Sequence, residues 1–169
     1  YYKLQTFLYL TANGVVQGMR PLISYNYGAG ELTRVRKIYK ISLTIIAAMM
    51  VVGVIICFAV PEMLMKMFTS NPDTIRIGVT ALRIICIGFI ASAVSVTSAG
   101  AFEALGKGIQ SFMISFLRYV AVILPAAFIL SRTFGADSIW NAFWIAEFVT
   151  AAAAWLLYRN ILKPRKGTE

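Results

Sequence analysis

Histidine, and the combinations of residues on which chemical catalysis commonly depends, are missing from this sequence. It has no histidine, the usual proton shuttle and metal ligand near neutral pH. No nucleophile stands beside a base, and no two carboxylates are paired in the chain. The glycines at 28 and 30 lack the preceding strand that a phosphate-binding loop needs. We therefore expect no enzyme, no metal site and no organic cofactor.

Charged residues are also scarce, at 14% of the chain, while hydrophobic residues make up 59% and the mean hydropathy is +0.75. A soluble domain is about half apolar and about a quarter charged, so this chain is expected in a lipid bilayer. The net charge of +9 does not indicate nucleic-acid binding, because the basic residues lie at the edges of apolar runs. The two cysteines, Cys57 and Cys86, are expected to be isolated packing residues with no disulfide.

Five apolar segments are long enough to cross a hydrocarbon core of about 30 Å, which takes about twenty helical residues. They are residues 4–25, 38–60, 77–101, 112–131 and 139–158. The runs are too long and too uniformly apolar for barrel strands. Short connections make consecutive helices antiparallel neighbours. We predict one all-α polytopic membrane domain over residues 1–169, and we interpret the start at Tyr1 as that of a carboxy-terminal fragment.

The basic residues between these segments predict the orientation of the chain. Nine lie after the first, third and fifth segments, and four lie on the other side. Because loops rich in Lys and Arg stay in the cytoplasm, loops 26–37 and 102–111 and the carboxy terminus are predicted to be cytoplasmic. The nine are Arg34, Arg36, Lys37, Lys40, Lys107, Arg159, Lys163, Arg165 and Lys166.

Two charged residues lie deep inside predicted spans. Glu147 is about eight residues, or about 12 Å, into the last span, which places it near the midplane. Intramembrane carboxyl groups normally face a cavity or a partner, so Glu147 is either a candidate proton carrier or a packing residue bonded to a neighbouring helix. Arg118 can snorkel to the interface or reach Glu103. Pro125, seven residues further on, is expected to kink that helix.

Polar side chains at helical spacing mark three further faces. Gln5, Asn13 and Gln17 form a polar stripe on the first span that is expected to face helices or water. Ser95 belongs to a run of small and hydroxyl residues on the third span that favours close packing, or a surface along a cavity. Trp144 on the last span is a candidate for a cavity wall or for the interfacial aromatic belt.

Residues 17–30, which read QGMRPLISYNYGAG, resemble the MATE family of multidrug and toxic compound extrusion transporters. Basic residues follow this motif at Arg34 and Arg36, as in the family. The motif residues that we single out as structural are Pro21, Asn26, Tyr27, Gly28 and Ala29, together with Pro125. Residues 103–107, Arg118 and residues 144–147 agree with the same resemblance.

The resemblance implies a twelve-helix, two-lobe fold in which this chain supplies helices eight to twelve, without the amino-terminal lobe. It implies export of cationic and amphipathic organic compounds across the bacterial inner membrane, in exchange for protons or sodium ions. The substrate and ion pathway would include Glu147, Arg118, Gln17, Asn13, Gln5, Trp144 and Ser95. Sodium-coupled members carry acidic residues in helices seven, eight and ten. The corresponding helices eight and ten of this chain carry only amides and hydroxyls, so the coupling ion stays open.

Two other functions are compatible with parts of the sequence. A flippase for lipid-linked oligosaccharides, from a related superfamily, would line its cavity with several basic residues to bind diphosphate, and only Arg83 and Arg118 lie deep here. A membrane-embedded enzyme or a scaffold subunit is the remaining class. Integral enzymes usually show acidic or histidine clusters at one interface, and none is present.

Overall fold

A computed structural model of the chain describes residues 2–134 and 139–161. All the elements in these residues are helical. Their bounds are α1 Tyr2–Gly28, α2 Leu32–Ala59, α3 Pro61–Lys66, α4 Pro72–Cys86, α5 Gly88–Ala104, α6 Gly108–Phe116, the π-helical η1 Leu117–Ile123, α7 Leu124–Phe134 and α8 Asn141–Ile161.

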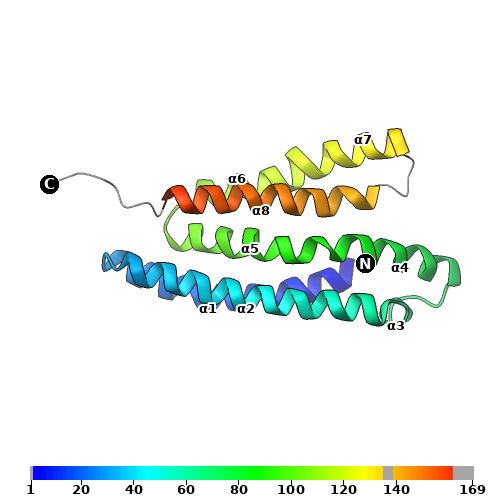
Figure 1. Cartoon of the computed structure of the whole chain (residues 1–169), viewed down its shortest axis with the longest axis horizontal. Coiled ribbons are helices and arrows are strands. Elements are labelled where there is room, and N and C mark those ends of the chain that lie inside the picture. Colours follow the sequence, from blue (N-terminus) through cyan, green and yellow to red (C-terminus); the bar gives the residue numbers. More distant parts are fainter. Residues whose placement is uncertain (1, 135–138, 162–169) are drawn as a thin grey trace.

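The long helices run side by side along the longest axis of the molecule, and α5 lies at the centre of the bundle. The α1–α2 pair lies on one side of α5, and α8 with the α6–α7 segment lies on the other (Figure 1). The α1–α2 turn, the α5–α6 turn and the carboxyl end of α8 lie at one end of the bundle. The α3–α4 connection lies at the opposite end, so alternate connections share a side, as a polytopic chain requires.

Small and hydroxyl residues allow α5 to occupy this central position. Its hydroxyls at Ser92, Ser95 and Thr97 are buried, and each donates to a carbonyl three or four residues back, at 2.7–3.1 Å. Buried polar groups are thereby satisfied within the helix itself. Gly100 lies where a Cβ atom would collide with Val16 of α1. The predicted packing role of this run therefore describes most of α5.

The two loops predicted to be cytoplasmic, 26–37 and 102–111, are shorter than the sequence suggested. Helix α1 continues through Pro21 to Gly28, and α2 begins at Leu32, so only residues 29–31 connect them. Gly30 permits the tight turn with φ of +76°. Most of predicted loop 26–37 is therefore helical, and residues 105–107 alone connect α5 to α6 within predicted loop 102–111. Both predicted loops are too long because the polar and basic residues that indicate a loop in the sequence lie on helix ends in the structure.

The predicted third span is bent. Helices α4 and α5 meet at residue 87 at an angle of 54°. The cap of α4 is Asn71, whose Oδ1 accepts from the backbone N–H of Asp73 at 3.0 Å and of Thr74 at 3.3 Å. Pro72 occupies the first helical position, which needs no backbone N–H, so the cap falls on the residue before it.

Three of the described helices are long and apolar enough to cross a membrane, and the bent α4–α5 pair would be a fourth. The three are Leu32–Ala59, Gly108–Thr133 and Asn141–Asn160. Helix α1 has the length, at 27 residues, but its polar stripe and Arg20 lower its hydropathy. The five predicted spans thus stay a prediction for α1. The predicted linker at 135–138 lies outside the described residues.

The π-helical segment η1 interrupts the fourth predicted span just before Pro125. Proline has no N–H to donate and its ring clashes with the carbonyl four residues earlier, here that of Ala121. A π-helical segment, with its wider turn, is one way to accommodate this conflict. Beyond it, α7 runs away from α8 towards its end (Figure 1).

Candidate functional site

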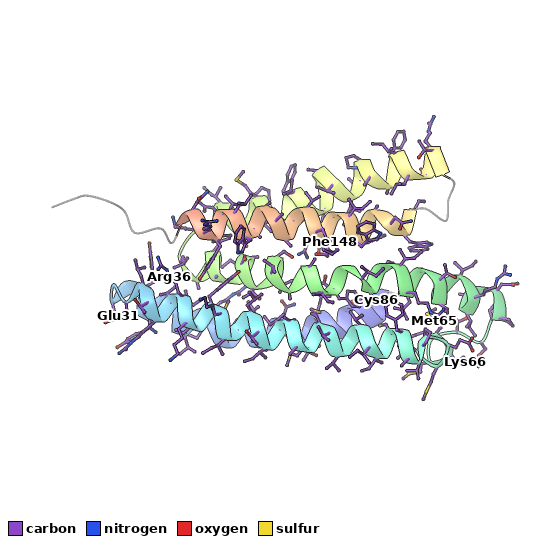
Figure 2. The ribbon with its side chains drawn as sticks, in the orientation of Figure 1. Glu31, Arg36, Met65, Lys66, Cys86 and Phe148 are labelled. Carbon is purple, nitrogen blue, oxygen red and sulfur yellow. The ribbon has the colours of Figure 1, made fainter. Side chains whose placement is uncertain are left out.

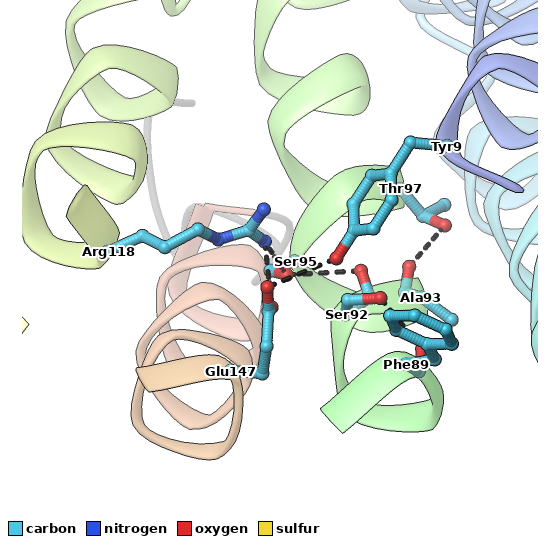
Figure 3. A network of polar contacts seen from close by, with 8 residues as sticks. All are labelled: Tyr9, Phe89, Ser92, Ala93, Ser95, Thr97, Arg118 and Glu147. Atoms are coloured by element: carbon cyan, nitrogen blue, oxygen red, sulfur yellow. Dashed lines mark hydrogen bonds and ion pairs between the residues drawn. The ribbon is translucent and has the colours of Figure 1, made fainter. Parts of the chain in front are cut away.

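A buried ion pair joins the two deep charged residues that the sequence singled out separately. Arg118 Nη2 lies 3.2 Å from Glu147 Oε2, and the two residues are only 7% and 8% exposed. The same guanidinium donates to Ser95 Oγ on α5. Tyr9 on α1 donates its hydroxyl to Glu147 Oε1 at 3.1 Å (Figure 3). Four helical segments, α1, α5, η1 and α8, therefore meet in one polar network.

The two predictions for Arg118, that it snorkels to the interface or that it contacts Glu103, are both wrong, because Arg118 is only 7% exposed and lies beside Glu147. Arg118 bonds instead to Ser95, which lies eight residues before Glu103 on α5, or about 12 Å along the helix axis. Glu103 forms an ion pair with Arg20 of α1 and accepts from Ser111 Oγ at 2.9 Å. The deeper position of Arg118 follows from its place near the start of η1, which packs against α8, and its side chain reaches α5 from there.

Backbone contact between α5 and α8 brings Glu147 into place. A Cβ atom on Gly88 would lie 3.1 Å from the Cα of Trp144 and 3.2 Å from Glu147 Cγ. Only glycine leaves room for α8 at this point, since a helix backbone cannot move aside as a flexible side chain can. Ser95 uses its own proton on the Ser92 carbonyl, at 3.1 Å, so its oxygen is free to accept from Arg118.

Packing holds the phenol of Tyr9 in position. Its ring meets Phe89 edge-on, with centroids 6.3 Å apart and planes at 86°. Such edge-to-face pairs restrict ring orientation. Tyr9 was not predicted as a site residue, although the sequence contains a signal for it, since it lies one helical turn before Asn13 and thus on the same polar stripe.

The polar network is incompletely satisfied. In the described part of the chain, Arg118 Nε is buried with no hydrogen-bond partner, and Glu147 Oε2, also buried, has no partner beyond its ion pair with Arg118 Nη2. Native proteins pair nearly all buried polar atoms, and a charged pair without its full set of hydrogen bonds recovers less of its desolvation penalty. The Arg118–Glu147 pair therefore has fewer hydrogen bonds than a pair buried this deeply usually has.

A hollow of about 200 Å³ opens beside the network, between α1, α5 and the α6–η1 segment. Its polar lining includes Tyr9, Asn13, Ser95 and Arg118 near the buried pair. Arg20, Glu103 and Ser115 line it as well. The hollow thus lies beside two ion pairs that differ in burial. The Arg118–Glu147 pair is buried, whereas the side chains of Arg20 and Glu103 are 35% and 42% exposed.

The structure places two further candidates, Gln17 and Trp144, outside the lining of this hollow. Gln17 is exposed and accepts from Arg20 Nη1 at 3.3 Å. The indole of Trp144 donates to Asn141 Oδ1 at 2.9 Å and packs edge-on against Phe148. The side chain of Gln5 lies outside the described residues. The site therefore unites Glu147, Arg118, Ser95 and Asn13 of the seven candidates.

The motif residues have local roles in the structure. Asn26 Nδ2 donates to the carbonyl of Leu22 at 2.8 Å, and the turn that follows is closed by backbone hydrogen bonds. Tyr27, Gly28 and Ala29 lie at the end of α1 and in its exit turn. Pro21 and Pro125 lie inside helical segments. Cys57 and Cys86 are both free and buried, and the Cys86 thiol donates to the carbonyl of Arg83 at 3.3 Å.

A family model, that of MatE, matches residues 2–129, about three quarters of the chain. The chain belongs to the MATE family. The multidrug export protein MepA of Staphylococcus aureus strain MSSA476 is 26% identical over 156 residues, covering 92% of this chain and 34% of the relative. MepA of Staphylococcus saprophyticus matches at the same identity and coverage. The chain thus spans about a third of the length of these curated relatives. It belongs to a family of transporters, not of enzymes.

Solved MATE structures share the fold of the chain. An outward-facing multidrug resistance MATE transporter of the MOP superfamily superposes with a TM-score of 0.93 at 17% identity, over 99% of this chain and 38% of that one. The Vibrio cholerae MATE transporter VcmN in its bent form gives 0.85 at 22% identity, over 95% of this chain and 37% of that one. The MATE multidrug transporter DinF-BH, solved as a complex, gives 0.84 at 27% identity, over 93% and 35%. The predicted all-α membrane fold is therefore confirmed, and the partial coverage is consistent with one incomplete lobe of a two-lobe transporter.

Proposed function

We propose that this MATE chain is part of a secondary active exporter of cationic and amphipathic organic compounds, coupled to entry of protons or sodium ions. Two observations support the export of drugs. The MepA relatives are named multidrug export proteins, and DinF-BH, at 27% identity, is described as a multidrug transporter. The partner that completes the pathway is the amino-terminal lobe of the same polypeptide.

The observation that carries the coupling mechanism is the buried Arg118–Glu147 pair beside the hollow. With both groups ionised, the pair has no net charge, so it does not repel an organic cation nearby. A proton or sodium ion that neutralises the Glu147 carboxylate leaves the charge of Arg118 uncompensated. The hollow then gains one positive charge, which repels an organic cation by Coulomb's law in a medium of low dielectric constant.

This charge change provides the competition that antiport requires. Binding of the coupling ion weakens binding of the substrate cation, and binding of the substrate cation weakens binding of the coupling ion. The two ions need not contact the same atoms for this to occur. When the coupling ion leaves, Arg118 again pairs with Glu147 and the hollow accepts a new cation. The unsatisfied Arg118 Nε supports this exchange of partners, because few hydrogen bonds beside the ion pair must break for it to occur.

The flippase alternative is weaker on this geometry. Arg118 is neutralised by Glu147, and Arg83 lies on the exposed face of α4 and not in the hollow. The described hollow thus offers a lipid diphosphate no net positive charge at its deep end.

Orientation is proposed on the distribution of charge at the two ends of the bundle. The end with the α1–α2 and α5–α6 turns and the carboxyl end of α8 carries Arg34, Arg36, Lys37, Lys107 and Arg159. We assign this end to the cytoplasm of a bacterial inner membrane, since positive loops stay inside.

Dye efflux from cells that express the full-length protein tests the role of Glu147. We expect Glu147→Gln to abolish coupled efflux, because its amide cannot change charge with the coupling ion. Glu62→Gln is the matched control, since Glu62 is an exposed acid on α3, outside the site. Unchanged efflux by the Glu147→Gln protein, at an expression level equal to that of the control, contradicts the proposed coupling role.

A further inference from the structure

A second hollow, of about 340 Å³, lies on the outer surface of α2 near its first turns. Its described lining includes three basic side chains, Arg36, Lys37 and Lys40, with the Thr33 hydroxyl, and no acidic side chain. Its volume lies in the range of small-ligand clefts. Arg36 lies at the same end of the bundle as Glu31 (Figure 2). The remaining basic residue of this segment, Arg34, is 4.0 Å from Glu31 and is partly compensated.

The fifth lining residue, Ile41, begins an apolar track on the same face of α2. Ile45 lies one turn further on, and Val52 two turns beyond that, and all three are 43–55% exposed. From Ile41 to Val52 the helix rises about 17 Å, at 1.5 Å per residue. This length is close to half of a hydrocarbon core of about 30 Å, that is, to one leaflet.

We propose that this face of α2 binds one anionic phospholipid, with its phosphodiester among Arg36, Lys37 and Lys40 and an acyl chain along Ile41, Ile45 and Val52. The assignment to a phospholipid rests on the order of the basic residues and the apolar residues along α2. Basic side chains stand at the depth of the headgroups, and the apolar track continues directly from them towards the bilayer centre. A soluble phosphate compound would match the charged part alone, and the exposed apolar track would have no occupant.

Charge complementarity favours an anionic headgroup over a zwitterionic one. Basic residues near a membrane surface each strengthen binding to anionic lipid by about fivefold. A zwitterionic headgroup carries its own cation beside the phosphate, which Lys37 and Lys40 repel. The inference does not depend on which ion drives transport or which compound is exported, and its failure leaves the proposed export function untouched.

Native mass spectrometry of the purified full-length protein in detergent micelles tests the proposal. The probes are dioleoylphosphatidylglycerol, dioleoylphosphatidylcholine and free glycerol phosphate. We expect tighter binding of the phosphatidylglycerol than of the phosphatidylcholine. The double variant Lys37→Gln/Lys40→Gln is expected to weaken phosphatidylglycerol binding by about thirtyfold, fivefold for each charge. Both lysines are exposed, so the fold is preserved.

A charge-matched control removes the same number of lysines elsewhere. Lys66→Gln/Lys107→Gln changes one residue at the opposite end of the bundle and one in the α5–α6 turn, and it is expected to bind phosphatidylglycerol as the unchanged protein does. Equal losses in both double variants would overturn the site, because they would show only an effect of net charge. Equal binding by the Lys37→Gln/Lys40→Gln variant and the unchanged protein would overturn it as well.

A variant of the track separates a lipid from a free phosphate. Ile45→Ser is expected to weaken binding of the dioleoyl lipid several-fold without affecting glycerol phosphate. Displacement of the lipid by glycerol phosphate at equal concentration would identify a headgroup-only phosphate site and overturn the lipid assignment.

Discussion

Removing one partner of the Arg118–Glu147 pair should destabilise the protein far more than removing both. Glu147→Gln leaves a buried guanidinium without its counter-charge, and breaking a buried pair in this way costs about 3–5 kcal/mol. Glu147 is 8% exposed and Arg118 is 7% exposed, so water cannot replace the missing charge. At about 2–4 °C per kcal/mol, the midpoint of thermal unfolding should fall by about 6–20 °C.

The double variant Arg118→Gln/Glu147→Gln provides the second half of a double-mutant cycle. Two amides can bond to each other and keep the contacts with Tyr9 and Ser95, with no buried charge left over. We therefore expect the double variant to lose about 2–3 kcal/mol less free energy of unfolding than the two single variants lose together. Unfolding of the purified protein in detergent, followed by tryptophan fluorescence, measures all four forms.

The exposed pair of Arg20 and Glu103 is the matched control for that cycle. Both side chains are about one-third or more exposed, so solvent screens their attraction, and the coupling between them should be at most about 1 kcal/mol. Additive effects in the Arg118–Glu147 cycle, equal within error to those of the control cycle, would refute the reasoning, since they would mean that the two groups do not interact as charges.

Three further perturbations follow from contacts in the structure. Gly88→Val should greatly reduce the yield of folded protein, measured by size-exclusion chromatography, because its side chain would meet the backbone of α8; Gly14→Val, with open space around the glycine, is the control. Tyr9→Phe removes a hydrogen bond to a charged carboxylate and should destabilise the protein by about 1.5–3 kcal/mol in thermal unfolding, and an unchanged midpoint would contradict the bond. Cys57 and Cys86 are free and buried, so a maleimide should label neither thiol in the folded protein and both after denaturation in sodium dodecyl sulfate, and rapid labelling of the folded protein would contradict their burial.

Hydropathy and charge were sufficient to predict the helical membrane fold, since the bilayer restricts the chain to a few architectures. Element boundaries were less predictable. The glycines at 28 and 30 and the basic residues at 34–37 suggested a long loop, yet α1 and α2 extend over nearly all of it. A glycine at a helix end and charges in a first turn are both compatible with helix near a membrane surface, so neither marks a boundary by itself.

The site was predicted residue by residue but not as a network. Burial cost alone singled out Glu147 and Arg118, because each is expensive in a bilayer wherever it points. Their contact depends on how α8 approaches α5 at Gly88, and on where η1 aims a long side chain. Neither is a property of local sequence. Tyr9 is the opposite case, a site residue that the sequence indicates only weakly. It lies on the polar stripe of α1, but a tyrosine near a membrane interface is already explained by the aromatic belt.

The seven-residue π-helix has a consequence for the way the two halves of its span can turn. A π-helical turn holds more residues than an α-helical one, so converting one such turn to α-helix shifts the register by one residue. That shift rotates everything on one side of the joint by about 100° and moves it by about 1.5 Å along the axis. Since Arg118 lies within η1, such a change of winding would swing its guanidinium away from Glu147 while α8 stays still. A change of winding in this one segment would thus rotate α6 and α7 relative to each other.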